Sequence, residues 1–582
     1  MPPRRLPAPP VDRTTRAPLV QFTFDGHAYD GIEGEPLAVS LLAADRPILS
    51  RSFRFHRPRG LMCSTGQCGW CECEVDGRPS VRSCRVPVRA GLVARGEHAL
   101  PSVDRDLLSL LGLTSRWIPP TFYHHRFLRP RALRQRYLAV LRWFGGRGRL
   151  GTGERVPPPG RSARRVELDV LVVGGGRAGL MAALGAAETA RRVVLIEAET
   201  SLGGAGRVDS GIEQGLDAIG DLANQARHAG VEILAGVAAI GWYHGMVAAI
   251  GEGLRYELRA RTIVAATGSY DRVPLVPGAD RPGVMSARMV VELVDRYRVL
   301  PGERAMLVGA GPELTAAGQR LAGAGAEVVG PVTAPSLRRI LGRRRVSGAV
   351  HAVAGRERRE RVDLVVFADR SPNIDLVLAA GAAVERRGGV VVPVCDPSGA
   401  TSLATLFVAG SAAGRRTVTA ADAEMARLAG QAAGLRAAAG SANAQGNQAA
   451  GSPRPARAEE STGAIVPGVA AALSAAAVPA AAVPAAASAS DALVCFCEDV
   501  HVREVRAEQR AGYADPELIK RRTGALTGPC QGKYCLQAFA CVTGPAADGP
   551  MGLPTARPPL RPVRLGDLVP SNDATVAGDA TR

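Results

Sequence analysis

Short runs of apolar residues bounded by glycine mark the centre of this chain. One run, at residues 170–173, is followed by three glycines and an Ala-rich stretch, and a second run lies at 193–196. Such runs are typical of strands that are buried on both faces of a sheet, and the stretch between them is long enough for a helix. The order strand, turn, helix and strand predicts an α/β unit built on a parallel sheet.

The glycines of this unit match the fingerprint of a dinucleotide-binding fold. Gly174 permits the tight turn, Gly176 lets a pyrophosphate approach the backbone, and Gly179 lets the helix lie close to the strand. Glu197 follows Gly179 by 18 residues, where the fingerprint has a carboxylate that accepts ribose hydroxyls. The pyrophosphate is then expected at the helix N-terminus. A glycine-rich turn without a ligand is the alternative, and it fits the complete order of elements less well.

Upstream, apolar and polar residues alternate as they do in strands. Residues 19–24 alternate, Asp25 and Gly26 form a hairpin signal, and Pro36 to Ala44 predicts a short helix before a cysteine-rich loop. This is the order of elements in a small β-grasp ferredoxin domain.

Four cysteines in and after that loop have the spacing of an iron-sulfur site. Four residues separate Cys63 from Cys68, two separate Cys68 from Cys71, and Cys84 follows after twelve more. This spacing matches the plant-type ferredoxin loop, in which four thiolates hold a [2Fe-2S] cluster. Zinc is the alternative, although zinc ligands usually form two closely spaced cysteine pairs.

A second nucleotide-binding unit begins near residue 301 and departs from the fingerprint. Leu314 stands at the third glycine position, so the close packing of helix on strand is lost, and the second strand, 326–331, ends without a carboxylate. We expect this inserted domain to keep its fold and not to bind NAD(P). The alternative is a working NADH site whose carboxylate comes from elsewhere.

A second group of cysteines follows an Ala/Pro-rich linker. One residue separates Cys495 from Cys497, four separate Cys530 from Cys535, and two short helices are predicted between the pairs. The pairs resemble those of the bacterioferritin-associated ferredoxin-like [2Fe-2S] domain. Tetrahedral zinc is again the alternative. Basic residues available to offset the charge of a cluster are Lys520, Arg521, Arg522 and Lys533.

Length and composition limit the class of protein. A chain of 582 residues is too long for one core, and its net charge of +18 comes from scattered arginines without an aromatic platform, so we expect no nucleic-acid binding. Grouped cysteines are typical of metal binding in a reducing compartment, and neither a signal peptide nor a transmembrane segment is evident, which predicts a cytoplasmic protein. The expected division is a disordered tail at 1–18, a ferredoxin-like domain at 19–99, a connector at 100–165, a two-dinucleotide-binding domain at 166–438, a linker at 439–490, a second [2Fe-2S] domain at 491–544 and a disordered tail at 545–582.

The two cysteine groups, the fingerprint and the segments 51–60 and 118–130 resemble the large (α) subunits of heteromeric sarcosine oxidase, opine oxidase, hydrogen cyanide synthase and hydroxyproline dehydrogenase. The Ala-Thr-Gly268 strand end and the segment 405–414 resemble FAD-contacting parts of two-dinucleotide-domain flavoproteins, except that Ser411 replaces the usual acid. The implied fold is an α/β Rossmann-like flavoprotein with an N-terminal β-grasp [2Fe-2S] domain and a small α-rich C-terminal [2Fe-2S] domain. The residues expected to contact FAD are Gly174, Gly176, Gly179, Glu197, Gly204, Thr267, Gly268, Gly410 and Ser411.

The resemblance implies an electron-transfer subunit of a heteromeric amine or amino-acid dehydrogenase or oxidase, of opine, sarcosine, proline or hydroxyproline type. A flavin accepts two electrons and a cluster carries one, so a flavin beside two clusters is suited to splitting a hydride equivalent. We expect no catalytic residue here, because no acid-base or nucleophile constellation stands beside the flavin site. Amine oxidation is expected in an FAD-dependent β subunit, with a ferredoxin, quinone or respiratory carrier as acceptor.

Three points stay open from the sequence. The resemblance allows an FMN at the subunit interface, which no residue of this chain indicates. The chain also fits a self-contained NAD(P)H-dependent reductase of a ferredoxin or small acceptor. It fits, thirdly, a catalytically silent electron conduit that stabilises its partner.

Overall fold

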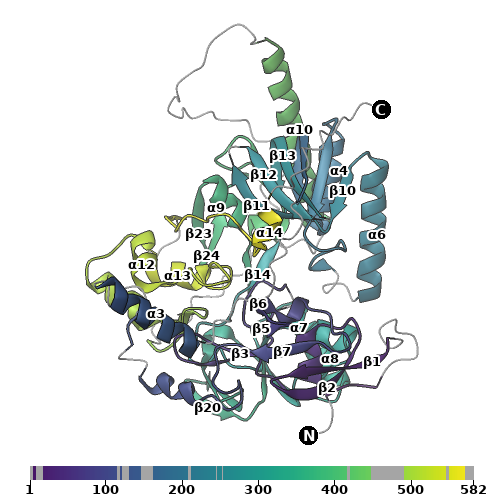
Figure 1. The fold of residues 1–582 in the computed structure, drawn as a ribbon. Coiled ribbons are helices and arrows are strands. Elements are labelled where there is room, and N and C mark those ends of the chain that lie inside the picture. The colour runs from purple at the N-terminus through teal and green to yellow at the C-terminus, as the bar shows by residue number, and fades with distance from the viewer. Residues whose placement is uncertain are drawn as a thin grey trace.

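The computed structural model describes residues 4–7, 17–63, 65–114, 118–120, 130–145, 161–206, 212–243, 245–251, 253–415, 420–446, 490–544 and 549–569. These residues form an N-terminal ferredoxin-like domain, a first nucleotide domain, an inserted second nucleotide domain and a small C-terminal domain (Figure 1). This is the α/β architecture that the sequence predicts.

The N-terminal domain is a mixed sheet covered by a helix. Its elements are β1 (Leu19–Phe24), β2 (His27–Ile32), α1 (Leu37–Ala43), β3 (Ser50–Arg51), β4 (Pro58–Arg59), β5 (Glu72–Val75), β6 (Arg78–Arg82), η2 (Ser83–Arg85) and β7 (Val93–Gly96). The sheet order is β2-β1-β7-β5-β6, with β1 and β7 parallel. The predicted hairpin turn lies at Asp25 and Gly26, both with positive φ, and every residue of α1 is buried. The β-grasp order of elements is confirmed.

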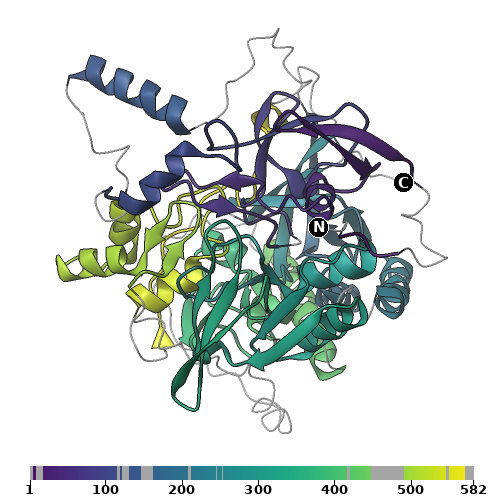
Figure 2. The same cartoon turned by 90° about the horizontal axis from the view of Figure 1, so that it is seen from below.

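The predicted connector contains two described helices. They are η3 (Leu107–Thr114), a 3-10 helix, and α3 (Arg131–Gly145), which Figure 2 shows standing apart from the body of the molecule. Most of the segment 118–130, which carries part of the family resemblance, lies outside the described residues.

The first nucleotide domain is a seven-stranded sheet between helices. Its elements are β8 (Ala163–Val173), α4 (Arg177–Ala187), β9 (Val193–Glu197), α6 (Ile212–His228), β10 (Glu232–Ala235), β11 (Ala238–Tyr243), β12 (Met246–Gly251), β13 (Leu254–Ala265), β25 (Leu406–Val408), η6 (Gly410–Ala413) and α10 (Ala420–Gly446). The order is β10-β9-β8-β13-β12-β11, with β25 also paired to β13. Strands β10, β9, β8, β13 and β25 are parallel, so their carboxyl ends meet at one edge, where such sheets bind ligands.

Helices α4 and α10 lie in close contact through small residues. A Cβ atom at Gly430 of α10 would lie 1.8 Å from the Ala182 carbonyl oxygen of α4, and one at Gly185 would lie 2.0 Å from the Arg427 carbonyl oxygen. Helix α10 continues to Gly446, past the predicted end at 438, because alanine has the highest helix propensity. The helix therefore includes the start of the predicted linker, and residues 447–489 lie outside the described part of the chain.

The inserted domain repeats the parallel pattern on a smaller scale. Its elements are β15 (Val284–Ser286), α7 (Ala287–Val291), the π-helix η4 (Glu292–Arg296), β16 (Arg304–Val308), α8 (Pro312–Gly323), β17 (Glu327–Val332), η5 (Ala334–Ser336), β18 (Leu337–Leu341), β19 (Gly348–Val353), β20 (Arg356–Glu360) and β21 (Leu364–Phe367). The parallel sheet has the order β15-β21-β16-β17. Leu314 on α8 is 2% exposed and packs in the core, and Glu313 beside it forms an ion pair with Arg370.

Further elements connect the two nucleotide domains. Strands β14 (Ser269–Asp271) and β22 (Arg370–Pro372) form an antiparallel pair between them. They are followed along the chain by α9 (Asp375–Ala380), β23 (Val384–Arg387) and β24 (Val390–Pro393).

The C-terminal domain places two short helices between its cysteine pairs, as the sequence predicts. Its elements are β26 (Leu493–Cys495), β27 (Val500–His501), α11 (Val502–Arg510), α12 (Pro516–Thr523), α13 (Leu536–Thr543), β28 (Gly549–Pro550) and α14 (Leu565–Leu568). Asp515 caps α12 by accepting a hydrogen bond from the Leu518 N–H, and Gly524 ends it with φ 72°. Figure 2 shows this domain beside both the ferredoxin-like domain and the inserted domain, and apolar side chains of all three form one core.

Parts of both tails that the sequence predicts to be disordered are ordered. In the N-terminal tail, Arg4 pairs with Asp45 and Arg5 with Glu35. In the C-terminal tail, β28 adds an edge strand to β23, and the Leu560 side chain is buried. Pro-rich segments gain order here from contacts with distant strands, which local composition does not reveal. No helix in the described part of the chain is long and apolar enough to cross a membrane.

Candidate redox site

The dinucleotide fingerprint forms a tight turn between β8 and α4. Gly174 has φ 116°, and a Cβ atom there would lie 2.3 Å from the Ala266 carbonyl oxygen. A Cβ atom at Gly179 would lie 1.8 Å from the Gly174 carbonyl oxygen. At Gly176 the nearest atom to a Cβ, the Gly203 carbonyl oxygen, is 3.8 Å away, so this backbone faces open space. The three glycines therefore have the separate geometric roles that the fingerprint predicts.

Glu197 ends β9 beside this turn. One carboxylate oxygen accepts a hydrogen bond of 2.6 Å from the Gly175 N–H, and the other accepts one of 2.8 Å from the Glu199 N–H. These bonds fix the carboxylate at the edge of the turn. Gly204 lies nearby with φ 51°, and the neighbouring Gly203 N–H donates to the Gly175 carbonyl.

The opposite wall comes from the end of β13 and from β25. Thr267 donates a hydrogen bond of 2.7 Å to the Asn373 carbonyl, and Gly268, with φ 76°, accepts one from the Asn373 N–H. Gly410, with φ 63°, begins η6, and Ser411 next to it faces the same space.

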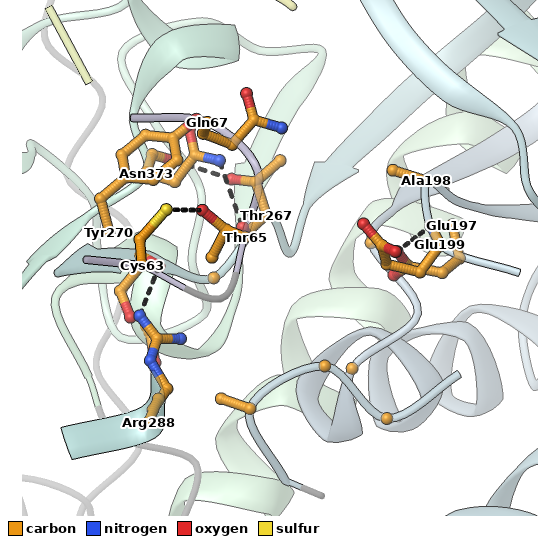
Figure 3. Close-up of a pocket in the computed structure, with 18 of the residues that line it drawn as sticks. Cys63, Thr65, Gln67, Glu197, Ala198, Glu199, Thr267, Tyr270, Arg288 and Asn373 are labelled. Carbon is orange, nitrogen blue, oxygen red and sulfur yellow. Dashed lines mark hydrogen bonds between the residues drawn. The ribbon is translucent and has the colours of Figure 1, made fainter. Parts of the chain in front are cut away.

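These elements enclose a cavity of about 360 Å³. Of the residues predicted to bind FAD, Gly174, Gly176, Glu197, Gly204, Thr267, Gly268 and Ser411 line it, whereas Gly179 and Gly410 shape the backbone behind it. In Figure 3, Glu197 lies on one side of the cavity, and Cys63, Thr65 and Tyr270 lie on the other. Cys63 and Cys84 of the ferredoxin-like domain also line the cavity, so the predicted iron ligands and the predicted nucleotide site share one wall.

Arginines surround the cavity. Arg85 forms an ion pair with Glu199, Arg288 lies 2.7 Å from Asp271, and Arg561 of the C-terminal tail lies 4.0 Å from Glu199. Arg177, the first residue of α4, makes no ion pair with any residue that the structure describes. A guanidinium beside a helix N-terminus is suited to an anionic group such as a pyrophosphate.

The first cysteine group forms two contacting pairs. The side chains of Cys63 and Cys68 lie within hydrogen-bonding reach, as do those of Cys71 and Cys84. A hydrogen bond from Cys68 holds the pKa of the Cys63 thiol well below its usual value despite burial. Gly66 and Gly69, with φ 67° and 75°, let the loop turn around this group.

The second group is a chain of contacts. Cys530 contacts Cys497 and Cys535, and Cys535 also contacts Cys495. A Cβ atom at Gly528 would lie 2.2 Å from the Cys497 Cβ, so only glycine fits there. Among the described residues, no three His, Cys, Asp or Glu side chains form a group that would hold a single metal ion.

The two cysteine groups lie against each other. The Cys497 sulfur is 4.0 Å from the Cys68 carbonyl oxygen, and the rings of Trp70 and Phe496 meet edge to face with centroids 5.2 Å apart. Trp70 lies between Cys68 and Cys71 in the chain, and Phe496 lies between Cys495 and Cys497. The remaining cysteines point elsewhere: Cys73 donates to the Leu49 carbonyl, and Cys541 to the Gly389 carbonyl.

Most of the basic residues expected to balance the second group have other partners. Lys520 and Arg521 pair with Glu517, and Arg522 pairs with Glu508, along the helices α11 and α12. Lys533 is buried and lies 3.2 Å from Asp375, which lines the cavity. Sequence reasoning missed Arg59, which reaches the Phe496 carbonyl from a strand more than 400 residues away. Its place in the Arg-Pro-Arg-Gly segment was the one available signal.

Three protein-family models match separate parts of the chain. A 2Fe-2S iron-sulfur cluster binding domain matches residues 17–99, a pyridine nucleotide-disulphide oxidoreductase domain matches 168–344, and a sarcosine oxidase A3 domain matches 489–571. The first two coincide with the predicted ferredoxin-like and nucleotide domains. The third coincides with the second cysteine group and the ordered part of the C-terminal tail.

Curated relatives and a solved structure cover larger parts. The alpha subunit of sarcosine oxidase from Rhizobium meliloti is 28% identical over 96% of this chain and 58% of its own length. The large subunit of opine oxidase from the same organism is 28% identical over 69% of this chain and 98% of its own length. The crystal structure of L-proline dehydrogenase from P. horikoshii is 23% identical, with a TM-score of 0.63 over 95% of this chain and 98% of that one, which is a likeness of fold.

The agreement runs through every described domain, from the ferredoxin-like sheet to the A3 match. The chain spans little more than half of the sarcosine oxidase relative and almost the whole of the opine oxidase one. From this sequence and fold, the chain is a homologue of the alpha subunits of sarcosine oxidase and of the corresponding subunits of opine oxidase.

Proposed function

We propose that this chain is the electron-relay subunit of a heteromeric oxidoreductase acting on CH–NH donors, with FAD in the cavity and a [2Fe-2S] cluster at each cysteine group. One observation supports this most strongly. Cys63 lines the nucleotide cavity while its own loop touches the second cysteine group, so the three predicted cofactor sites are contiguous.

The cavity residues fit a dinucleotide. The Gly176 backbone leaves room for a pyrophosphate at the start of α4, with Arg177 beside it to neutralise charge. Glu197 is fixed where a ribose would lie. Ser411 offers a hydroxyl in place of the usual acid, and it can bond a ribityl hydroxyl less strongly than a carboxylate would.

The cysteine groups fit two-iron clusters. Each iron of such a cluster takes two thiolates, and the sulfurs of the first group meet as two pairs. Low pKa values of the Cys63 and Cys530 thiols, each caused first by a hydrogen bond from a neighbouring cysteine, supply thiolates for metal binding.

A bound flavin takes up two electrons together, and iron-sulfur clusters pass electrons on singly. The protein residues supply the route and exclude water from it. Cys63, Cys68, Cys71, Cys495, Cys530 and Cys535 are buried. Tyr270 in the cavity wall also packs against Tyr534, with centroids 5.7 Å apart, so the second cysteine domain borders the cavity too.

The substrate class and partner follow from the relatives. Their names are those of sarcosine and opine oxidase subunits, and the solved structure of like fold is a proline dehydrogenase. The shared chemistry is oxidation of a secondary amine or amino acid, which we assign to a partner flavoprotein. FMN at the interface with that partner remains part of the proposal, and the acceptor is a ferredoxin, quinone or respiratory carrier in the cytoplasm.

Metal and sulfide analysis of cysteine variants tests the assignment. Cys535→Ser is expected to remove about half of the iron and acid-labile sulfide, because it opens one of two clusters. Cys541→Ser, in the same domain but turned toward Gly389, is the matched control and is expected to keep all of it. Zinc in place of iron, or equal iron loss in both variants, contradicts the proposal.

A further inference from the structure

Arg59 stands between the two cysteine groups. It is the last residue of β4, and its side chain is 4% exposed. One guanidinium nitrogen lies 2.6 Å from Asp280. The other donates hydrogen bonds of 2.7 Å to Asp499 and 2.8 Å to the Phe496 carbonyl. The guanidinium also lies 5.6 Å from the centre of the Trp70 ring.

These contacts reach both loops at their centres. Phe496 is the residue between Cys495 and Cys497, and Trp70 lies between Cys68 and Cys71. A side chain that donates to the first and lies over the second holds the loops at a fixed separation.

Arg59 belongs to a buried charge network. Arg57 binds Asp280 through two nitrogens, and Arg54 pairs with Glu504 and donates to the Asp499 carbonyl. Burial raises the pKa of Asp280, but Arg57 and Arg59 outweigh it and lower that pKa far below its usual value. The named arginines and carboxylates balance in number, so removing one arginine leaves a buried negative charge beside the second group.

We propose that Arg59 is a positioning residue for electron transfer between the two clusters: it fixes the Cys495–Cys497 loop against the Cys68–Cys71 loop and makes the second cluster easier to reduce. This inference rests on the proposed function, because it requires both clusters. The physical reason is that a fixed cation within hydrogen-bonding distance of the loop favours an added electron, since charge and hydrogen bonds near a cluster set its potential.

A purely structural role makes a different prediction. If Arg59 only held the domains together, Arg57→Gln would have the same effect as Arg59→Gln, because each removes one arginine from Asp280. Arg57 has no contact with Phe496 or Trp70 in the structure. Arg59→Lys keeps the positive charge but loses the forked geometry that reaches two carboxylates and a carbonyl at once.

The test is a redox titration of the full-length chain followed by electron paramagnetic resonance. Reduced wild-type protein is expected to show two cluster signals that split each other through spin-spin coupling. In Arg59→Gln the midpoint potential of the second cluster should fall and the splitting should weaken, with a smaller change in Arg57→Gln. Arg59→Lys should restore the potential more fully than the splitting.

Each result bears on the inference. An Arg59→Gln protein that keeps only the first cluster also supports it, since the second loop has then lost its anchor. Unchanged potential and splitting in Arg59→Gln, or equal changes in Arg57→Gln, would overturn it while leaving the proposed function intact. Should Arg59→Gln not fold, Arg59→Lys decides: splitting equal to that of the wild type overturns the inference. A wild-type chain without iron contradicts the proposed function, and the inference with it.

Discussion

The hydroxyls of Thr65 and Tyr534 lie 2.7 Å apart, although 469 positions separate the two residues in the sequence. Thr65 also lies 3.6 Å from the Cys63 sulfur, and Tyr534 immediately precedes Cys535. The hydroxyl pair therefore joins the first cysteine group to the second through two hydrogen bonds and one peptide bond.

Removing this hydroxyl link is expected to slow electron transfer between the clusters. Tyr534→Phe keeps the ring that packs on Tyr270, so the fold and the iron content should not change. We expect the reduction of the second cluster after flash reduction of the first to slow several-fold, measured by freeze-quench spectroscopy. Tyr513→Phe, on the exposed side of the same domain, is the control. An unchanged rate in Tyr534→Phe would show that the contact between Cys68 and Cys497 carries the transfer alone.

Arg177 is expected to bind the pyrophosphate of the dinucleotide. Arg177→Gln removes a charge-assisted hydrogen bond worth about 1.5–3 kcal/mol, so the affinity for FAD should fall about tenfold or more. Equilibrium dialysis of FAD against the flavin-stripped protein measures this. The control is Arg227→Gln on α6, whose side chain bonds Asn224 away from the cavity. Equal affinity in both variants would remove Arg177 from the site.

Gly179 is expected to tolerate no side chain. A methyl group there would lie 1.8 Å from the Gly174 carbonyl oxygen, so Gly179→Ala should lower the free energy of unfolding by about 2–3 kcal/mol and release the flavin. Gly220 on α6 has open space around it, and Gly220→Ala should raise the stability by about 0.5–1 kcal/mol through helix propensity. Thermal unfolding and flavin fluorescence report both effects. A Gly179→Ala protein as stable as the wild type would mean that α4 does not lie where the structure places it.

Glu504 should make the contact between the first and last domains sensitive to acid. Burial raises the pKa of Glu504, but hydrogen bonds from His501 and Arg54 outweigh it and lower the pKa from 4.5 to about 2. The folded state then binds this proton less readily than the unfolded state. The resulting stabilisation, up to about 3 kcal/mol, is present above pH 4.5 and is lost as the pH falls towards 2.

Urea unfolding at several pH values checks this dependence. The difference in stability between wild type and Glu504→Gln should be largest near neutral pH and should narrow below pH 4.5. Glu508→Gln, which alters a surface pair with Arg522 on the neighbouring helix, should show a difference that changes little with pH. A constant difference for Glu504→Gln would contradict the assigned pKa.

Local signals in the sequence sufficed wherever a function depends on neighbouring residues. The turn at Gly174, the acid at Glu197 and both cysteine spacings all lie within short segments, and their geometry follows from backbone rules. Contacts between distant segments could not be predicted. Arg59 gains its role from Asp499 and Phe496 far along the chain, and the tail after residue 548 is ordered by pairing with β23.

The inserted domain shows the same limit from the other side. Leu314 marked the loss of the third glycine, and the structure buries that side chain in the core. The ion pair of Glu313 with Arg370 joins a helix to a strand of the domain junction, and no local pattern indicates it. That the inserted domain does not bind NAD(P) stays a prediction.

Anaerobic reductive titration of the purified chain tests the central claim most directly. A chain with one flavin and two [2Fe-2S] clusters should take up about four electrons, two at the flavin and one at each cluster, with the cluster absorbance bleaching in two steps. Uptake of two electrons or fewer by protein with a full complement of metal would contradict the account.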